Sequence, residues 1–205
     1  MIAIIDYGMG NLGSILNMLK KVGAETVISS DAALIERADK LILPGVGAFD
    51  YGIKNLTEHG LIPLLNAQVI ESKKPILGLC LGMQLFTRHS AEGQLPGLGW
   101  IDAETVRFQF DQANVHLKVP HMGWNSLRVC QPHPIFIDLD NEPRFYFVHS
   151  YHVVCADTRN VLAQTRYGDD FASVIGQGNI TGVQFHPEKS HRFGMQLLKN
   201  FAEHS

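Results

Sequence analysis

Residues 75–84 read PILGLCLGMQ, an apolar run that meets Gly78, Cys80 and Gly82 and then continues with helical spacing. This order predicts a buried strand, a sharp turn and a helix, with Cys80 on the turn. The first N–H groups of the helix would favour a thiolate and could stabilise an oxyanion. Cys80 is therefore a candidate nucleophile. The alternative is a buried structural cysteine, since free cysteines are often small core residues.

The sequence before and after this turn predicts an α/β fold over one domain, residues 1–205. Short apolar runs alternate with helical spacing in the first hundred residues, which is typical of a mostly parallel sheet with helices on both faces. After residue 100, β-like runs separated by turn residues predict an appended antiparallel part. The predicted strands are 2–6, 25–28, 40–43, 75–79, 104–110, 115–119, 144–148 and 173–176. The predicted helices are 11–22, a stretch through 64–65, and 191–201, with a hairpin turn at 177–179.

Composition narrows the class of protein. A chain of 205 residues buries enough surface for a sizeable core, and a net charge of −3 argues against nucleic acid or an anionic membrane as partner. The apolar start ends at Asp6, too early for a signal peptide or a membrane span. The three cysteines, Cys80, Cys130 and Cys155, form no Cys-x-x-Cys pair, so neither a disulfide scaffold nor a zinc-thiolate site is expected. We expect a cytoplasmic protein with free thiols.

Residues 182–188 read GVQFHPE and supply a partner for a thiol nucleophile. Pro187 holds the segment extended, so His186 and Glu188 should project to one side. A carboxylate beside an imidazole fixes its tautomer and stabilises its charged form. Alone, this is also what a loop histidine beside a surface glutamate looks like. Combined with Cys80, it predicts a Cys-His-Glu triad.

With GLCLGMQ at 78–84 and QFHPE at 184–188, the sequence resembles the class I (triad) glutamine amidotransferases over essentially its whole length. Further segments narrow the resemblance: IDYGMGNL at 5–12, PGVGAF at 44–49, PHMGWN at 120–125 and YFVHSY at 146–151. These are similar to the glutaminase subunits of imidazole glycerol phosphate synthases, enzymes of histidine biosynthesis.

The resemblance implies a mechanism. The Cys80 thiolate attacks the side-chain amide of glutamine, His186 protonates the departing ammonia and then activates water, and Glu188 orients His186. Glutamine would be held by Gln84, His149, Ser150 and Tyr151. The oxyanion hole would use the N–H of Leu81 and the loop of Gly45, Val46 and Gly47. The resemblance also implies that glutaminase activity stays low until the partner holds its substrate, and we expect a peptide flip near Val46 to be the switch.

The implied partner is a cyclase subunit with a (β/α)₈ barrel fold, which receives the ammonia. The interface would include Pro120, Met122, Trp124, Tyr146 and Lys189. On physical grounds alone, residues 120–125 fit an interface loop or a loop tucked into the domain almost equally. No cofactor and no metal are expected.

Five alternative interpretations stay open at this level. Gly8, Gly10 and Gly13 follow the first strand, with Asp31 about 20 residues on, as in dinucleotide-binding proteins, but a second mononucleotide-binding half is missing. A metal site is disfavoured because His149 and His152, on an extended segment, should face opposite sides. A cysteine peptidase and a non-catalytic binding module remain, as does an amidotransferase subunit of another pathway.

Overall fold

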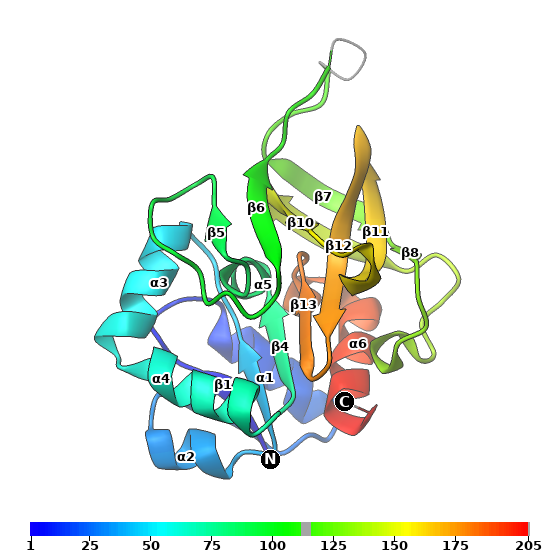
Figure 1. Ribbon diagram of the computed structural model, residues 1–205. Coiled ribbons are helices and arrows are strands. Elements are labelled where there is room, and N and C mark those ends of the chain that lie inside the picture. The colour runs from blue at the N-terminus through cyan, green and yellow to red at the C-terminus, as the bar shows by residue number, and fades with distance from the viewer. Residues whose placement is uncertain (112–115, 205) are drawn as a thin grey trace.

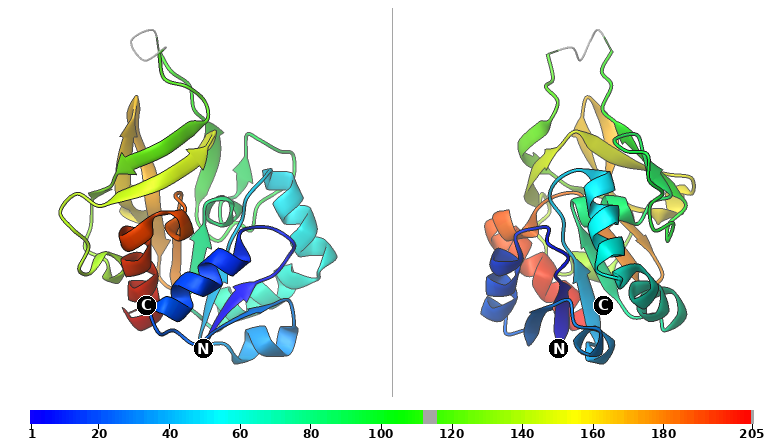
Figure 2. Two further views of the ribbon diagram at one scale, coloured as in Figure 1. Left: turned by 180° about the vertical axis from the view of Figure 1, so that it is seen from behind. Right: turned by 90° about the vertical axis from the view of Figure 1, so that its left-hand side faces the viewer.

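The computed structural model describes residues 1–111 and 116–204 (Figure 1). A central sheet runs through it in the order β2-β1-β3-β4-β13-β12-β10-β6-β5. Helices cover both faces of its first half, and the two described termini lie at the same end (Figure 2). The predicted α/β fold with a mostly parallel part and an antiparallel part is confirmed.

The first five strands of that order pair in parallel. They are β1 (Ile2–Ile5), β2 (Thr26–Ser29), β3 (Lys40–Leu43), β4 (Ile76–Leu79) and β13 (Ile180–Val183). The strands predicted in the first hundred residues are thus confirmed within one or two residues. The helices are α1 (Leu12–Lys21), α2 (Ala32–Arg37), α3 (Phe49–Glu58), α4 (Leu61–Asn66), α5 (Leu81–Leu85) and α6 (His191–His204). Short helical turns are η1 (Ala67–Glu71), η3 (Pro134–Phe136), η4 (Thr158–Asn160) and η5 (Pro187–Lys189).

Strand alternation divides the core between the two faces of the sheet. In β1, Ala3 and Ile5 pack in one apolar cluster with α3 and α4, whereas Ile2 and Ile4 pack in a second cluster with α1 and α6. Both faces are buried, so every residue of β1 is buried. This explains why the strand reads as a continuous apolar run.

The second half of the chain adds the antiparallel part. β12 (Asp169–Gln177) pairs with β13 across the predicted hairpin turn, and β10 (Tyr151–Cys155) and β6 (Ala103–Arg107) follow, with β5 (His89–Ser90) parallel to β6. β11 (Val161–Tyr167) joins β12 to β8 (Arg128–Val129). A separate ribbon of β7 (His121–Ser126) and β9 (Arg144–His149) crosses above α6 (Figure 2).

Two predictions around residue 115 are wrong. The strand expected at 104–110 ends at Arg107, and the one expected at 115–119 is not a strand over 116–119, while residue 115 lies outside the described residues. The strand occurs instead at β7, in the segment interpreted as a loop. Its alternation is inverted: His121 is buried, whereas Met122 and Trp124 are exposed. An apolar face turned outward hides the usual pattern of a half-buried strand.

Candidate active site

The turn between β4 and α5 positions Cys80 at the carboxyl end of the parallel sheet. Its backbone is left-handed, with φ +52° and ψ −105°, and its N–H donates to the Val183 carbonyl at 2.8 Å. Such a conformation is strained for a residue with a side chain and is typical of functional turns. Glycine is required beside it, because a Cβ on Gly82 would collide with the Leu43 carbonyl oxygen. The thiol is nearly enclosed, with 7% of the residue exposed.

His186 and Glu188 lie next to this turn. Nδ1 of His186 is 2.9 Å from Oε1 of Glu188, and each side chain is only 2% exposed. Since a carboxylate only accepts, Nδ1 carries the proton and Nε2 is the atom left for Cys80. Burial lowers the pKa of His186, but the interactions with Cys80 and Glu188 outweigh it and raise that pKa to about 10. The raised pKa means that the His186 imidazole is charged at neutral pH.

The loop after β3, predicted to form part of an oxyanion hole, contacts the turn that carries Cys80. The N–H of Leu81 donates to the carbonyl of Gly45 at 3.4 Å. The loop is held from behind, because the buried Tyr7 hydroxyl donates to the Pro44 carbonyl. Only glycine fits at 45, where a Cβ would lie 2.8 Å from the Leu81 Cβ. Gly47, at φ +122°, also has a conformation that favours glycine.

A cavity of about 250 Å³ opens onto the thiol. It is lined by Val46, Gly47, Cys80, Leu81, Gln84, Glu92, Pro120, Val148, His149, Ser150, Tyr151 and His186. The structure thus brings together almost all residues predicted for catalysis and glutamine binding. Gly45 lies behind the wall at Leu81, and Glu188 behind His186. Pro120, predicted for the partner interface, lines this cavity as well.

Glu92 is a residue of this cavity that the sequence analysis missed. It follows β5, and its Oε2 accepts the N–H of Phe49 at 2.9 Å. That contact ties the loop after β5 to the end of the Gly45–Gly47 loop. Nothing in the sequence separates Glu92 from an ordinary surface acid, since its place depends on how the loop folds back.

Gln84 is buried and does not lie on the outer surface of α5. Its Nε2 donates to the Tyr151 carbonyl at 3.1 Å and to Oε1 of Gln184 at 3.0 Å. Gln184, in turn, directs its Nε2 toward the Cys80 sulfur at 3.7 Å. Cys80, Gln84 and the Tyr151 carbonyl are therefore joined through Gln184 in one hydrogen-bond network.

The histidines near the cavity are arranged differently from the prediction. His149 and His152 do not face opposite sides: both rings lie against Phe108, at 5.2 and 4.7 Å between centroids, because Ser150 separates β9 from β10. Burial lowers the pKa of His149 to about 3 and that of His121 to about 4. Their rings are joined by a 3.0 Å hydrogen bond. Among the described residues, no cluster of three or more His, Cys, Asp or Glu could hold a metal ion.

The residues predicted for the partner interface gather beside the triad. Met122 and Trp124 are 62% and 40% exposed on β7. Trp124 stacks on His191 at 5.5 Å and meets the Tyr146 ring edge-on at 6.3 Å, while Lys189 Nζ lies 5.8 Å from the Tyr146 centroid. An apolar and aromatic surface of this kind is typical of an interface core.

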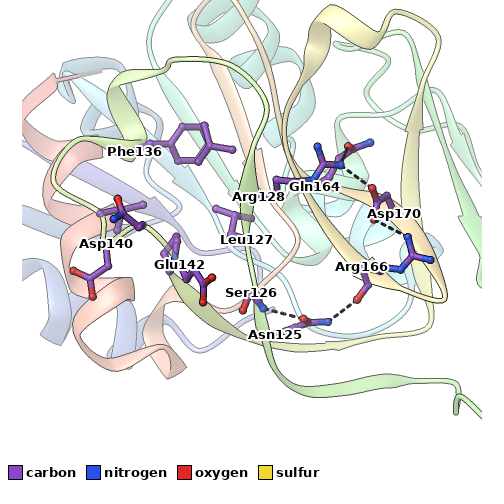
Figure 3. Close-up of a pocket in the computed structure, with 14 residues that line it drawn as sticks. Asn125, Ser126, Leu127, Arg128, Phe136, Asp140, Glu142, Gln164, Arg166 and Asp170 are labelled. Atoms are coloured by element: carbon purple, nitrogen blue, oxygen red, sulfur yellow. Dashed lines mark hydrogen bonds and ion pairs between the residues drawn. The ribbon is translucent and has the colours of Figure 1, made fainter.

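A larger cavity lies elsewhere, between the ribbon and β11 (Figure 3). Its volume is about 860 Å³, and it includes Arg128, Arg166 and Asp170. Asp170 pairs with Arg128 at 2.7 Å and with Arg166 at 3.8 Å. Because those charges already have partners, and because the cavity includes neither Cys80 nor His186, size does not identify the reactive site here.

The dinucleotide alternative loses its main support. The carboxylate of Asp31 accepts the N–H of Leu34 at 2.9 Å as the N-cap of α2, so it is engaged in a local structural role. Gly10 packs against Pro44, where a Cβ would lie 2.9 Å from the proline Cβ. Gly10 therefore packs against the loop after β3. None of the described helices is long and apolar enough to cross a membrane.

An α/β sheet carrying a cysteine elbow beside a buried His-Glu pair defines a class of enzyme. Residues 3–205 match the family described as Glutamine amidotransferase class-I, and the chain belongs to this family. The family predicted from the motifs is thus confirmed.

Within this family, the chain is most usefully compared with individual proteins and solved structures. The chain is 54% identical over 201 residues to imidazole glycerol phosphate synthase subunit HisH 2 of Methanococcus maripaludis, covering 98% of each protein. It is 51% identical to the protein of that name from Pseudomonas aeruginosa, covering 99% of each. A solved glutamine amidotransferase shares the fold at a TM-score of 0.66 and 22% identity, over 97% of this chain and 99% of that one. Another, from Thermotoga maritima, has a TM-score of 0.64 and 16% identity, over 94% and 77%.

Proposed function

We propose that this chain is the glutaminase subunit of an imidazole glycerol phosphate synthase. It hydrolyses glutamine to glutamate and ammonia, and passes the ammonia to a cyclase subunit that makes imidazole glycerol phosphate and an aminoimidazole carboxamide ribonucleotide. The observation that carries the proposal is the nearly enclosed Cys80 beside the buried His186–Glu188 pair at one cavity. Relatives at 47–54% identity bear the name of this subunit and support the pathway.

The triad accounts for both half-reactions. The Cys80 thiolate attacks the side-chain carbonyl carbon of glutamine, and the tetrahedral intermediate collapses as His186 Nε2 gives its proton to the leaving ammonia. His186 then takes a proton from water, which attacks the thioester and releases glutamate and the thiol. Glu188 fixes the Nδ1–H tautomer and stabilises the imidazolium in both steps.

The cavity fits the two ends of glutamine. Glu92 supplies a carboxylate for the α-ammonium group, a role that charge complementarity supports. Gln84 has its Nε2 engaged by two acceptors, so its Oε1 is the atom available to the substrate. The backbone of His149, Ser150 and Tyr151 lines the opposite wall.

The oxyanion loop gives the site a switch. With the Gly45 carbonyl accepting from Leu81, the donor needed by the oxyanion is already engaged. Turning the Gly45–Val46 peptide removes that carbonyl and presents the Val46 N–H instead, so two N–H groups face the developing charge. The conformation in which the Gly45 carbonyl accepts from Leu81 is the inactive one. Docking of the partner with its ligand selects the conformation in which the peptide is turned.

The partner is a cyclase subunit of (β/α)₈ barrel fold that binds over β7, β9 and η5. Met122, Trp124, Tyr146, Lys189 and Pro120 form this face beside the cavity, which is where ammonia must leave Cys80 without escaping to water. Residues 1–205 act as one glutaminase domain, and the complex works in the cytoplasm.

The test is a glutaminase assay with and without the purified cyclase subunit and its phosphorylated ribonucleotide substrate. The cyclase subunit together with its substrate should stimulate glutamate release. Cys80→Ala should abolish glutamate release but leave the synthesis of imidazole glycerol phosphate from added ammonium intact. Cys130→Ala, at an exposed thiol, is the matched control and should behave as wild type. Absence of stimulation would instead favour an amidotransferase of another pathway. A rise in melting temperature on adding NAD or NADP would revive the dinucleotide alternative.

A further inference from the structure

Gln184 is a fully buried glutamine between β13 and His186. Its backbone N–H donates to the Ser173 carbonyl at 2.9 Å, which fixes the segment to β12. From this anchored position the side-chain Nε2 lies 3.7 Å from the Cys80 sulfur. The mechanism described above gives Gln184 no role, although it contacts the nucleophile.

The other end of the same amide contacts Gln84. Oε1 of Gln184 accepts from Gln84 Nε2 at 3.0 Å, and that nitrogen also donates to the Tyr151 carbonyl at 3.1 Å. Both N–H bonds of Gln84 are therefore engaged, and its oxygen is left to face the cavity.

The orientation of both amides follows from the Tyr151 carbonyl. A carbonyl only accepts, so Gln84 must present its nitrogen there, and the same nitrogen meets Gln184. Gln184 must then turn its oxygen toward Gln84, which leaves its nitrogen at Cys80. A thiolate is stabilised by an N–H donor and repelled by an oxygen, so the network selects the favourable end.

We propose that Gln184 is a positioning residue: one end of its amide holds Cys80 as a thiolate, and the other fixes the orientation of Gln84 toward the substrate. The inference rests on the glutamine hydrolysis at Cys80 proposed above. Because the two ends of the amide serve different partners, mutation can separate their effects.

Two variants make that separation. Gln184→Glu keeps an oxygen for Gln84 but replaces the N–H at Cys80 with a second oxygen. Gln184→Met keeps similar volume and removes both hydrogen bonds. The matched control is Gln177→Glu, which adds the same charge at the exposed hairpin turn. The first readout is the pH midpoint of Cys80 alkylation by iodoacetamide, followed on the Cys80 peptide by mass spectrometry so that Cys130 and Cys155 do not contribute. The second is KM and kcat for glutamine in the complex with the cyclase subunit and its substrate.

Gln184→Glu should raise the alkylation midpoint by at least about one pH unit and lower kcat by about tenfold. Its KM should change by less than about twofold, because an oxygen that accepts from Gln84 Nε2 is kept. Gln184→Met should raise the pH midpoint of Cys80 alkylation. It should also raise the KM for glutamine by about fivefold. Gln177→Glu should match wild type in all three.

Wild-type alkylation midpoints in both Gln184 variants would overturn the positioning role and leave Gln184 as a space-filling residue. If Gln184→Met fails to fold by circular dichroism, the isosteric Gln184→Glu decides alone. Cys80→Ala separates a failure of the proposed function from a failure of the positioning role. If it keeps glutaminase activity, the proposed function fails; if it is inactive and Gln184→Glu has a wild-type midpoint, only the positioning role fails.

Discussion

The N–H of Leu81 and the carbonyl of Gly45 are joined by a hydrogen bond of 3.4 Å where we propose the oxyanion hole. The distance is long for an amide hydrogen bond, so the contact is weak. A weak contact suits a switch, since turning the Gly45–Val46 peptide then sacrifices little.

Gly45→Ala should therefore lock the loop in an unproductive position. A Cβ at 45 would lie 2.8 Å from the Leu81 Cβ and 2.8 Å from the Tyr7 hydroxyl, which forces the loop away from the elbow. Stimulated kcat should fall about 10²- to 10³-fold, the usual effect of losing an oxyanion donor. Iodoacetamide should still alkylate Cys80. Gly13→Ala, on α1 with no neighbour within 4 Å of the new Cβ, is the control. Equal turnover in the two variants would remove the loop from the mechanism.

Tyr7→Phe should destabilise the protein, because Tyr7 supports the loop of Pro44 and Gly45. The Tyr7 hydroxyl is buried and donates to the Pro44 carbonyl, so its removal leaves a buried carbonyl without its donor. The free energy of unfolding in urea should fall by about 1–3 kcal/mol. Tyr51→Phe removes a hydroxyl from a residue that is 65% exposed and should have almost no effect. Similar losses in both variants would contradict this account.

Much of this site could be predicted because its chemistry is local in the sequence. GLCLGMQ places a strand, the proposed nucleophile and a helix in one stretch, and HPE places the proposed base beside its carboxylate. Short parallel strands buried on both faces also leave clear apolar runs, as β1 and β3 do.

The remaining features depend on distant contacts. β7 was missed because its exposed Met122 and Trp124 invert the pattern of a half-buried strand. Glu92 and Gln184 acquire their partners across 43 and 104 residues of chain, so the residues around them do not reveal these contacts. The contact of His149 and His152 with one ring depends on the break at Ser150, which their three-residue spacing does not reveal.

Glu188→Gln should alter how stability depends on pH. The folded pKa of His186 is raised to about 10 from 6.5, so the stability from its protonation is fully present below 6.5 and is lost as pH rises toward 10. The variant lowers that pKa by removing the carboxylate. The stability advantage of wild type should be largest near pH 6 and shrink toward pH 10, as measured by urea unfolding across this range. An advantage that is constant with pH would show that Glu188 does not act through the charge on His186.

His121→Phe should act in the opposite pH range. Burial depresses the pKa of His121 to about 4, so the folded protein keeps this ring neutral while the unfolded chain binds a proton below about 6.5. Stability therefore falls as pH drops from about 6.5 to 4, by up to about 1.4 kcal/mol per unit for one proton. In the phenylalanine variant, the contribution of His121 to the pH dependence of the free energy of unfolding should disappear. The contribution of His149, whose folded pKa is about 3, should remain. Urea unfolding between pH 4 and 7 measures it, and an unchanged slope would exclude a neutral buried His121.

Trp124→Ala should weaken the complex without unfolding the subunit. The Trp124 side chain presents a large aromatic surface, 40% exposed, and its stacking on His191 and edge contact with Tyr146 hold it in a fixed orientation. Fixed, partly exposed aromatic residues are the usual hot spots of interfaces, so the Kd for the cyclase subunit should rise about 30-fold, or about 2 kcal/mol. The control is Val154→Ala, which removes an apolar group that is 49% exposed on β10, outside the ribbon and η5. Titration calorimetry measures the two affinities, and thermal melts check the fold.

Because the same face lies beside the cavity, Trp124→Ala should also reduce the stimulation of glutaminase activity at subsaturating concentrations of the cyclase subunit. At saturating concentrations, stimulation should return to the wild-type level. A wild-type Kd would move the partner to another face, and a deficit that persists at saturation would mean that Trp124 takes part in switching as well as in docking.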